Sequence, residues 1–155
     1  MAKLEADLRE FIALLNSHGV EYVLVGGHAV AYHGHPRFTG DTDFLIHPTA
    51  ANAVRVLRVL EDFGFGGIGI TEQDFVAEGR VVSLGHPPNR IDILTSISGV
   101  DFKTAWSSRV QSVLDDQPVT LLGWDALLEN KRASARAKDK ADVEKLLAIA
   151  KQKRR

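Results

Sequence analysis

The sequence predicts an α+β domain in which a small mixed β-sheet has helices packed on one side and is followed by a helical C-terminus. Short apolar runs containing β-branched residues alternate with segments of helical periodicity, and glycine or proline clusters separate them. The chain has 155 residues, 45% hydrophobic and 25% charged, as in a soluble domain that buries its own core. We expect a single domain over residues 1–155, with a core over about 1–122 and C-terminal helices over about 123–151.

Helical and strand patterns alternate through the first half of the chain. The predicted elements are, in order, a helix ended by Gly19, a buried strand over residues 21–25, a helical turn over residues 28–32, a second strand over residues 42–46, and a helix between Thr49 and Gly64. Thr49 is a residue type that caps helix N-termini, and glycine often follows a helix end. The glycine-rich residues 64–70 fit either a loop or a weak strand.

The second half begins with strand patterns and ends with helical ones. The predicted elements are an antiparallel hairpin of residues 81–84 and 90–95, a short helix capped by Asp101, short edge strands over residues 109–114 and 118–121, and helices near residues 123–137 and 140–151. Asp139 and Asp142 fit the N-cap and third position of the last helix. We therefore expect both of these acids to be structural.

Composition excludes several classes of protein. The chain has no cysteine, which excludes disulfides and thiolate metal sites and favours a cytoplasmic location. No apolar run approaches the roughly 20 residues of a membrane span, so we expect no membrane partner. The acidic first residues predict the start of an amphipathic helix and not a signal peptide.

Charge is distributed unevenly along the chain. Residues 131–155 contain ten Lys or Arg against three Asp or Glu, whereas residues 1–130 contain nine against seventeen. A basic end on an acidic body suits an anionic ligand such as a triphosphate or RNA. A solvated, frayed helix end is the alternative explanation for the final KQKRR segment.

Two carboxylates share one face of the second predicted strand. Side chains alternate along a strand, so Asp41 and Asp43 point the same way, together with Leu45. Two acids on a mostly apolar strand repel each other and lose hydration. A divalent metal would relieve both costs, and oxygen ligands suit Mg²⁺ or Mn²⁺.

A third acid, Asp92, lies within the apolar strand pattern of residues 90–95. If that strand lies beside residues 42–46, Asp92 joins Asp41 and Asp43. Three such carboxylates can hold two metal ions about 3.5–4 Å apart, an arrangement that serves nucleotidyl transfer. Spacing alone leaves other roles open, because Asp41 could cap a turn, Asp43 could lie at a sheet edge, and Asp92 could pair with Arg90.

Gly26 and Gly27 follow the first buried strand and open a helical turn. Glycine lets the backbone approach a ligand closely and adopt positive φ, and amides at a helix start face anions. The spacing is neither a P-loop nor a dinucleotide-binding pattern, and an isolated Gly-Gly pair is often a plain turn.

The combination of a strand, Gly-Gly, a short helix and Asp-x-Asp on the next strand resembles the polymerase-beta-like nucleotidyltransferase superfamily. The segment VGGHAVAYHGHPRFTGDTDFLI is similar to small prokaryotic nucleotidyltransferase-like proteins, including abortive-infection and toxin–antitoxin-associated members. His28 stands where many relatives carry serine. Residues 127–131 and 136–139 resemble the C-terminal segment of the same group.

The resemblance implies that Gly26 and Gly27 hold a triphosphate and that Asp41, Asp43 and Asp92 are catalytic and bind metal. We extend the candidate nucleotide-binding set to residues whose positions suit phosphate or loop contacts: His28, Arg37, Thr39, Lys131 and Arg136. Surface charge is the alternative explanation for the last two.

Three functions remain at this stage. The first is transfer of an NMP from an NTP to a hydroxyl of a protein, an RNA or a small molecule, with Mg²⁺ or Mn²⁺ and release of pyrophosphate. The second is a catalytically silent nucleotide- or metal-binding protein that acts as a toxin–antitoxin partner. The third is an RNA-binding module that uses the basic C-terminus.

Overall fold

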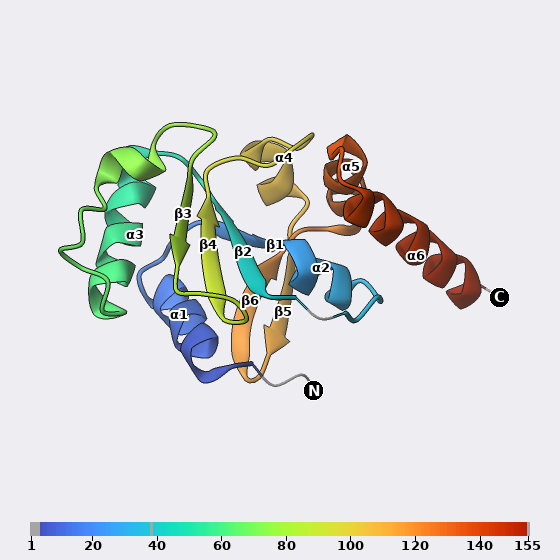
Figure 1. The fold of residues 1–155 in the computed structure, drawn as a ribbon, viewed down its shortest axis with the longest axis horizontal. Helices are drawn as coiled ribbons and strands as arrows, with labels where there is room; N and C mark the ends of the chain where they lie inside the picture. Colours follow the sequence, from blue (N-terminus) through green and yellow to red (C-terminus); the bar gives the residue numbers. More distant parts are fainter. Residues whose placement is uncertain (1–3, 38, 155) are drawn as a thin grey trace.

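Strands rich in valine, leucine and isoleucine form the centre of the molecule, and helices surround them (Figure 1). The computed structural model describes residues 4–37 and 39–154. Its strands are β1 (Tyr22–Val25), β2 (Asp41–Ile46), β3 (Val81–Leu84), β4 (Arg90–Leu94), β5 (Val110–Leu114) and β6 (Gln117–Leu121). Its helices are α1 (Ala6–Ser17), α2 (Gly26–Tyr32), α3 (Ala50–Asp62), the 3₁₀ helix η1 (Glu72–Phe75), α4 (Phe102–Ser107), α5 (Trp124–Ala133) and α6 (Ala137–Lys153).

The strands form one mixed sheet in the order β3-β4-β2-β1-β6-β5. The β1–β6 and β2–β4 pairs are parallel, and the other neighbours are antiparallel. The predicted hairpin of residues 81–84 and 90–95 is confirmed. Of the two predicted edge strands only β5 lies at an edge, because β6 pairs with β1 through Leu24 and Leu121.

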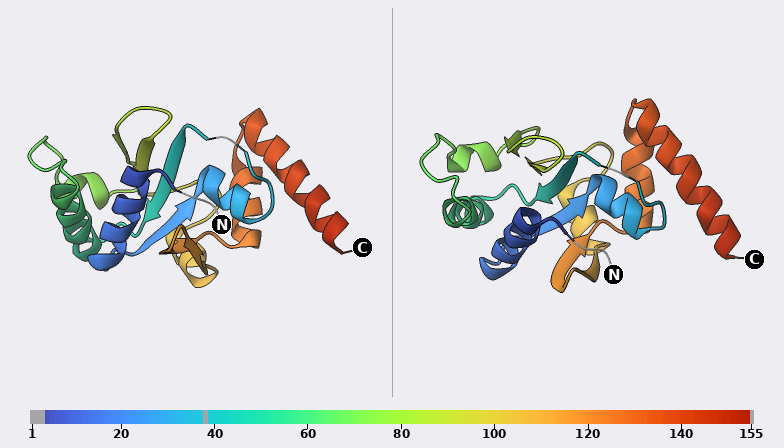
Figure 2. Two further views of the ribbon diagram at one scale, coloured as in Figure 1. Left: turned by 90° about the horizontal axis from the view of Figure 1, so that it is seen from below. Right: turned by 60° about the horizontal axis from the view of Figure 1, so that its bottom comes forward.

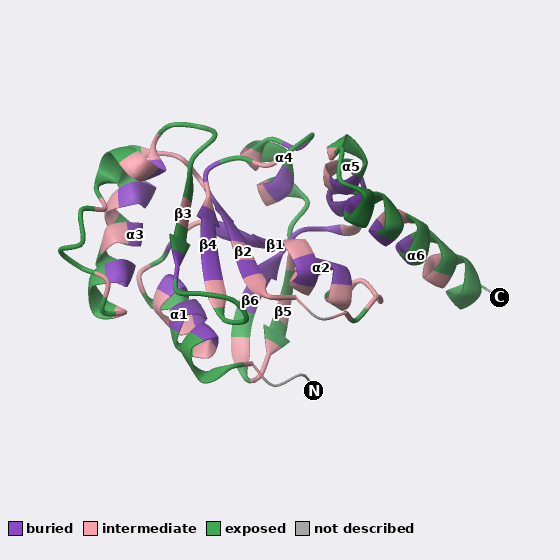
Figure 3. Ribbon diagram, in the orientation of Figure 1, coloured by how far each residue is buried: buried purple, intermediate pink, exposed green. Residues whose placement is uncertain are grey.

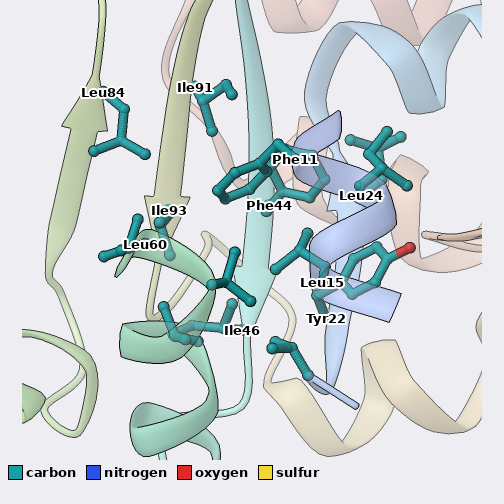
Figure 4. Close-up of a cluster of buried hydrophobic side chains, with 14 of the residues drawn as sticks. Phe11, Leu15, Tyr22, Leu24, Phe44, Ile46, Leu60, Leu84, Ile91 and Ile93 are labelled. Atoms are coloured by element: carbon teal, nitrogen blue, oxygen red, sulfur yellow. The ribbon is translucent and has the colours of Figure 1, made fainter. Parts of the chain in front are cut away.

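The predicted α+β class, with its mixed sheet and helical C-terminus, is confirmed, but helices cover both faces of the sheet. Alternate residues of β1 enter different cores, with Tyr22 and Leu24 on one face and Val23 and Val25 on the other. The helices α1 and α3 pack on the first face, where Phe11 contacts Phe44 (Figure 4). The helices α2, α4, α5 and α6 contribute to the second core, seen from two further directions in Figure 2. The expectation of one covered side was wrong because both faces of the central strands are apolar.

Local signals set most helix ends. The Thr49 side chain accepts a hydrogen bond from the amide of Asn52, and Asp101 caps α4 through the amide of Thr104, as predicted. Residues 64–70 form turns and irregular loop. No helix among the described residues is long and apolar enough to cross a membrane.

The last helix differs from the prediction at its start. It begins at Ala137 with Arg136 as its N-cap residue, three positions before the predicted cap, so Asp139 lies within the first turn. There the Asp139 carboxylate binds Lys131 and Ser134 and serves tertiary packing in place of capping. The helix extends away from the sheet, and its outer surface is largely exposed (Figures 1 and 3).

Candidate active site

Three carboxylates meet at one end of the central strands. Asp41 and Asp43 lie on β2, and the parallel register places Asp92 of β4 directly beside Asp43. One oxygen from each carboxylate lies within 4.8 Å of the others. Leu45 shares their face and packs into the core formed by α2, α4, α5 and α6. The sequence expectation that Asp92 joins the pair if its strand lies beside β2 is therefore confirmed.

The cluster holds negative charge that the protein does not fully neutralise. Burial, followed by repulsion from Asp41 and Asp92, raises the pKa of Asp43 to about 7. Burial also favours a raised pKa at Asp41, but hydrogen bonds from Arg90 and Thr39 outweigh it and lower that pKa. Asp43 is thus the carboxylate most in need of an added positive charge.

Arg90 forms ion pairs with two members of the cluster. Its Nη2 lies 2.7 Å from Asp41 Oδ2, and its Nε lies 3.2 Å from Asp92 Oδ1 without hydrogen-bond geometry. The Ser83 hydroxyl donates to Asp92 at 2.6 Å. The sequence prediction considered Arg90 only as an alternative partner of Asp92 and omitted Ser83. The hairpin register, which pairs Ser83 with Asp92, was the signal that could have found it.

Gly26 and Gly27 are required by close packing beside the carboxylates. Gly26 has φ +67°, and a Cβ there would lie 2.5 Å from Asp43 Oδ2. A Cβ on Gly27 would lie 2.9 Å from the Thr39 Cβ. Glycine therefore allows α2 to start directly against the acidic cluster and its preceding loop. Their contact with a triphosphate stays a prediction.

Lys131 and Arg37 belong to a buried ion network behind the cluster. The Arg37 guanidinium makes two 3.0 Å contacts to the Asp142 carboxylate. Lys131 Nζ lies 2.8 Å from Asp139 and 3.3 Å from Asp142. Both acids are thus structural, as expected, and they join α6 to α5 and to the loop before β2. The two cations are paired with protein carboxylates, and a phosphate contact by either one stays a prediction.

The remaining candidates lie in different surroundings. Thr39 borders the cluster, because its hydroxyl lies 3.2 Å from Asp41 Oδ1. His28 lines a cavity together with Thr39, Thr42 and Ile91. The Arg136 side chain is 69% exposed and lies 3.8 Å from Asp139. The structure therefore groups the glycines and Thr39 with the carboxylates, whereas Arg136 is at the surface.

The residues present fit a divalent cation. Three carboxylates offer hard oxygen ligands at suitable separations, and burial together with repulsion from the other two raises the pKa of Asp43. Mg²⁺ and Mn²⁺ both match this donor set, and the geometry does not select between them.

Comparisons with known proteins identify the fold. No protein-family model matches the sequence, and no curated protein matches it significantly. A solved antigenic nucleotidyltransferase-like protein from Paracoccidioides brasiliensis aligns with a TM-score of 0.56 at 17% identity, over 96% of this chain and 79% of that chain. The chain has a nucleotidyltransferase-like fold. The lincosamide antibiotic adenylyltransferase LnuA, solved with lincomycin, aligns with a TM-score of 0.54 at 17% identity, over 96% of this chain and 99% of its own.

Proposed function

We propose that this chain is a metal-dependent nucleotidyltransferase that moves an NMP from an NTP to a hydroxyl group and releases pyrophosphate. The observation that carries the proposal is the triad of Asp41, Asp43 and Asp92, with oxygens within 4.8 Å of one another on adjacent strands of a nucleotidyltransferase-like fold. Such closely spaced carboxylates are costly to a fold unless they bind a cation.

The carboxylates have two proposed roles. Asp41 and Asp43 would hold two divalent cations, Mg²⁺ or Mn²⁺, and Asp92 would help to hold the cation on the acceptor side. Bound cations would lower the pKa of the acceptor hydroxyl and stabilise the leaving pyrophosphate. Asp92 accepts the hydroxyl proton, and Ser83 orients its carboxylate through their 2.6 Å hydrogen bond.

The reaction is a substitution at phosphorus. The acceptor oxygen forms a bond to the α-phosphorus of the NTP, and the bond from that phosphorus to the bridging oxygen breaks. Pyrophosphate leaves with the electron pair of the broken bond. Gly26 and Gly27 allow the triphosphate to lie close to the backbone, because neither residue carries a side chain.

Contacts to the triphosphate are proposed for five further side chains. Thr39 borders the carboxylates, and His28 follows the glycine pair. Lys131 and Arg37 supply positive charge from the buried network, and Arg136 supplies it from the surface. Lysine acts as a point charge on phosphate, whereas arginine can bind two oxygens at once.

Label transfer tests the proposal directly. Purified protein is incubated with α-labelled NTPs, Mg²⁺ and a panel of protein, RNA and small hydroxyl acceptors, beside Asp43→Ala and the matched surface variant Asp125→Ala. We expect transfer by the wild type and Asp125→Ala and none by Asp43→Ala. Equal labelling by all three proteins would reject the mechanism.

Binding experiments distinguish two alternative functions from catalysis. A silent partner of a toxin–antitoxin pair would bind Mg²⁺ and NTP in a calorimeter without forming product from any acceptor. An RNA-binding module would bind RNA with a steep salt dependence that disappears when residues 151–155 are removed. The presence of all three acids in one cluster favours catalysis over the catalytically silent alternative.

A further inference from the structure

The strand β5 forms one edge of the sheet, and its outer side pairs with no other strand in the part of the chain that the structure describes (Figure 1). Natural edge strands are usually protected by lysine, proline or a β-bulge, which prevents pairing with another chain. The sequence of β5, VQSVL, contains neither lysine nor proline, and its register with β6 is continuous. The Val113 side chain is 54% exposed. This edge is therefore open to pairing with a further strand.

The turn between β5 and β6 determines which backbone groups of β5 face outward. Leu114 pairs with Gln117 across a two-residue turn, in which Asp115 and Asp116 both have positive φ. The residues that flank such a turn exchange hydrogen bonds, and bonded pairs then alternate with non-bonded pairs along an antiparallel ladder. Every second residue of β5, counted back from Leu114, therefore bonds to β6.

Gln111 and Val113 occupy the non-bonded positions of this ladder, so their N–H and C=O groups point away from β6. Val113 lies opposite Pro118, which has no N–H to donate and therefore suits a non-bonded position. The outer side of β5 thus offers the backbone donors and acceptors of two residues to another strand.

The charges at the two ends of β5 favour an antiparallel copy of the same strand as its partner. Arg109 precedes β5 and is exposed, and the acidic turn of Asp115 and Asp116 follows β5. Two antiparallel copies centred on Ser112 bring Arg109 of each copy opposite the acidic turn of the other. Asp115 already lies 3.8 Å from Arg9 of its own chain, so we expect the exposed Asp116 to meet Arg109. A parallel arrangement would instead place like charges side by side.

The same register also satisfies the backbone of both copies. Centring the pair on Ser112 places Gln111 of one copy opposite Val113 of the other, and these are the residues whose backbone groups face outward. A shift by one residue would direct paired side chains to opposite faces of the joined sheet. A shift by two residues would move Arg109 away from the acidic turn. Charge and hydrogen bonding therefore select one register.

The opposite edge strand, β3, lacks this pattern. Arg80 precedes β3, whereas Gly85-His86-Pro87-Pro88 follows it without an acidic residue. An antiparallel pair of β3 strands would therefore gain no ion pair, and the prolines protect that end of the edge. Arg80 is exposed, as Arg109 is, and provides a matched control.

We propose that two copies of this chain associate through β5, antiparallel and centred on Ser112, so that their six-stranded sheets become continuous. The inference is independent of the proposed function, since β5 carries none of the candidate site residues. A contact between two such short strands is small beside the roughly 1,200–2,000 Å² of stable interfaces. The dimer should therefore form reversibly and depend on protein concentration.

Sedimentation equilibrium of the full chain, from about 10 µM to about 1 mM, measures this association. The wild type is compared with Arg109→Glu, Val113→Lys and the control Arg80→Glu, and the urea midpoint of each variant shows that it is folded. Each substitution occurs twice at a two-fold interface, so we expect Arg109→Glu and Val113→Lys to weaken association about tenfold. Arg80→Glu should leave it unchanged. Adding Asp116→Lys to Arg109→Glu exchanges the charges and should restore it.

Amide hydrogen exchange tests the same interface without a substitution. The amides of Gln111 and Val113 should exchange more slowly at about 1 mM than at about 10 µM, whereas the Ser112 amide, which bonds to β6, should not change. A monomer at every concentration, or exchange at Gln111 and Val113 that is independent of concentration, would overturn the inference. A dimer that Val113→Lys leaves intact, that Arg80→Glu weakens equally, or that the charge exchange fails to restore would overturn it as well.

Discussion

Replacing Asp43 with asparagine should stabilise the metal-free protein while removing its metal site. The change keeps the shape of the side chain and removes a charge that burial disfavours and that Asp41 and Asp92 repel. An asparagine amide can also donate hydrogen bonds to its two carboxylate neighbours. Stability and metal binding are thus expected to change in opposite directions, as is typical of a functional site.

The magnitude follows from the pKa of Asp43. A rise from the ordinary value of 3.8 to about 7 corresponds to at most about 4 kcal/mol of folding free energy. Solvent at this partly exposed site reduces the effect, so we expect about 2–4 kcal/mol. Because the folded pKa is the higher one, the unfolded chain ionises first as pH rises. The wild type therefore loses stability between about pH 4 and pH 7, and Asp43→Asn does not.

Urea unfolding with EDTA at pH 5 and pH 8 measures the effect. The free energy of unfolding of Asp43→Asn should exceed that of the wild type by more at pH 8 than at pH 5. Adding Mg²⁺ at about 10 mM should reverse the order of stability, because the ion binds only the wild type. Asp41→Asn is the matched control and should destabilise, because the lowered pKa of Asp41 shows that its charge is stabilised by Arg90 and Thr39. If Asp43→Asn is destabilising at pH 8 without metal, the inferred cost of the Asp43 charge, from burial and repulsion, is wrong.

Three further outcomes are expected. Gly26→Ala should destabilise by about 1–3 kcal/mol and weaken Mn²⁺ binding, since alanine is strained at φ +67° and its Cβ would meet Asp43; unchanged urea midpoint and Mn²⁺ affinity would contradict this. Lys131→Met should cost about 3–5 kcal/mol by leaving the buried carboxylates of Asp139 and Asp142 without their shared cation; a loss under about 1 kcal/mol in urea unfolding would show that the network is dispensable. Mn²⁺ affinity, followed by electron paramagnetic resonance, should rise from pH 6 to pH 8, because Asp43 must lose its proton to bind metal; a flat profile would exclude that coupling.

Much of the fold could be predicted because local signals agreed with tertiary packing. Thr49 and Asp101 cap helices, as their residue types predict. Gly19 and Gly64 lie just after helix ends, and each has a positive φ. The coverage of both sheet faces was missed because a short apolar run such as Tyr22–Val25 shows burial without showing which elements bury it.

The site was predictable where strand alternation determines it. Asp41 and Asp43 necessarily share a face, and β4 then had only to lie beside β2 for Asp92 to join them. The network of Lys131 with Asp139 was not predictable in this way, because it depends on how α6 packs against α5. Sequence spacing carries no information on such a tertiary contact between separate helices.

A crystal structure with Mn²⁺ and a non-hydrolysable NTP is the most direct test of the acidic cluster as a nucleotidyltransferase site. Anomalous scattering should show two Mn²⁺ ions about 3.5–4 Å apart, bound by Asp41, Asp43 and Asp92 and by the triphosphate. Nucleotide bound elsewhere, or a cluster that carries no manganese and keeps only its Arg90 ion pairs, would contradict the assignment.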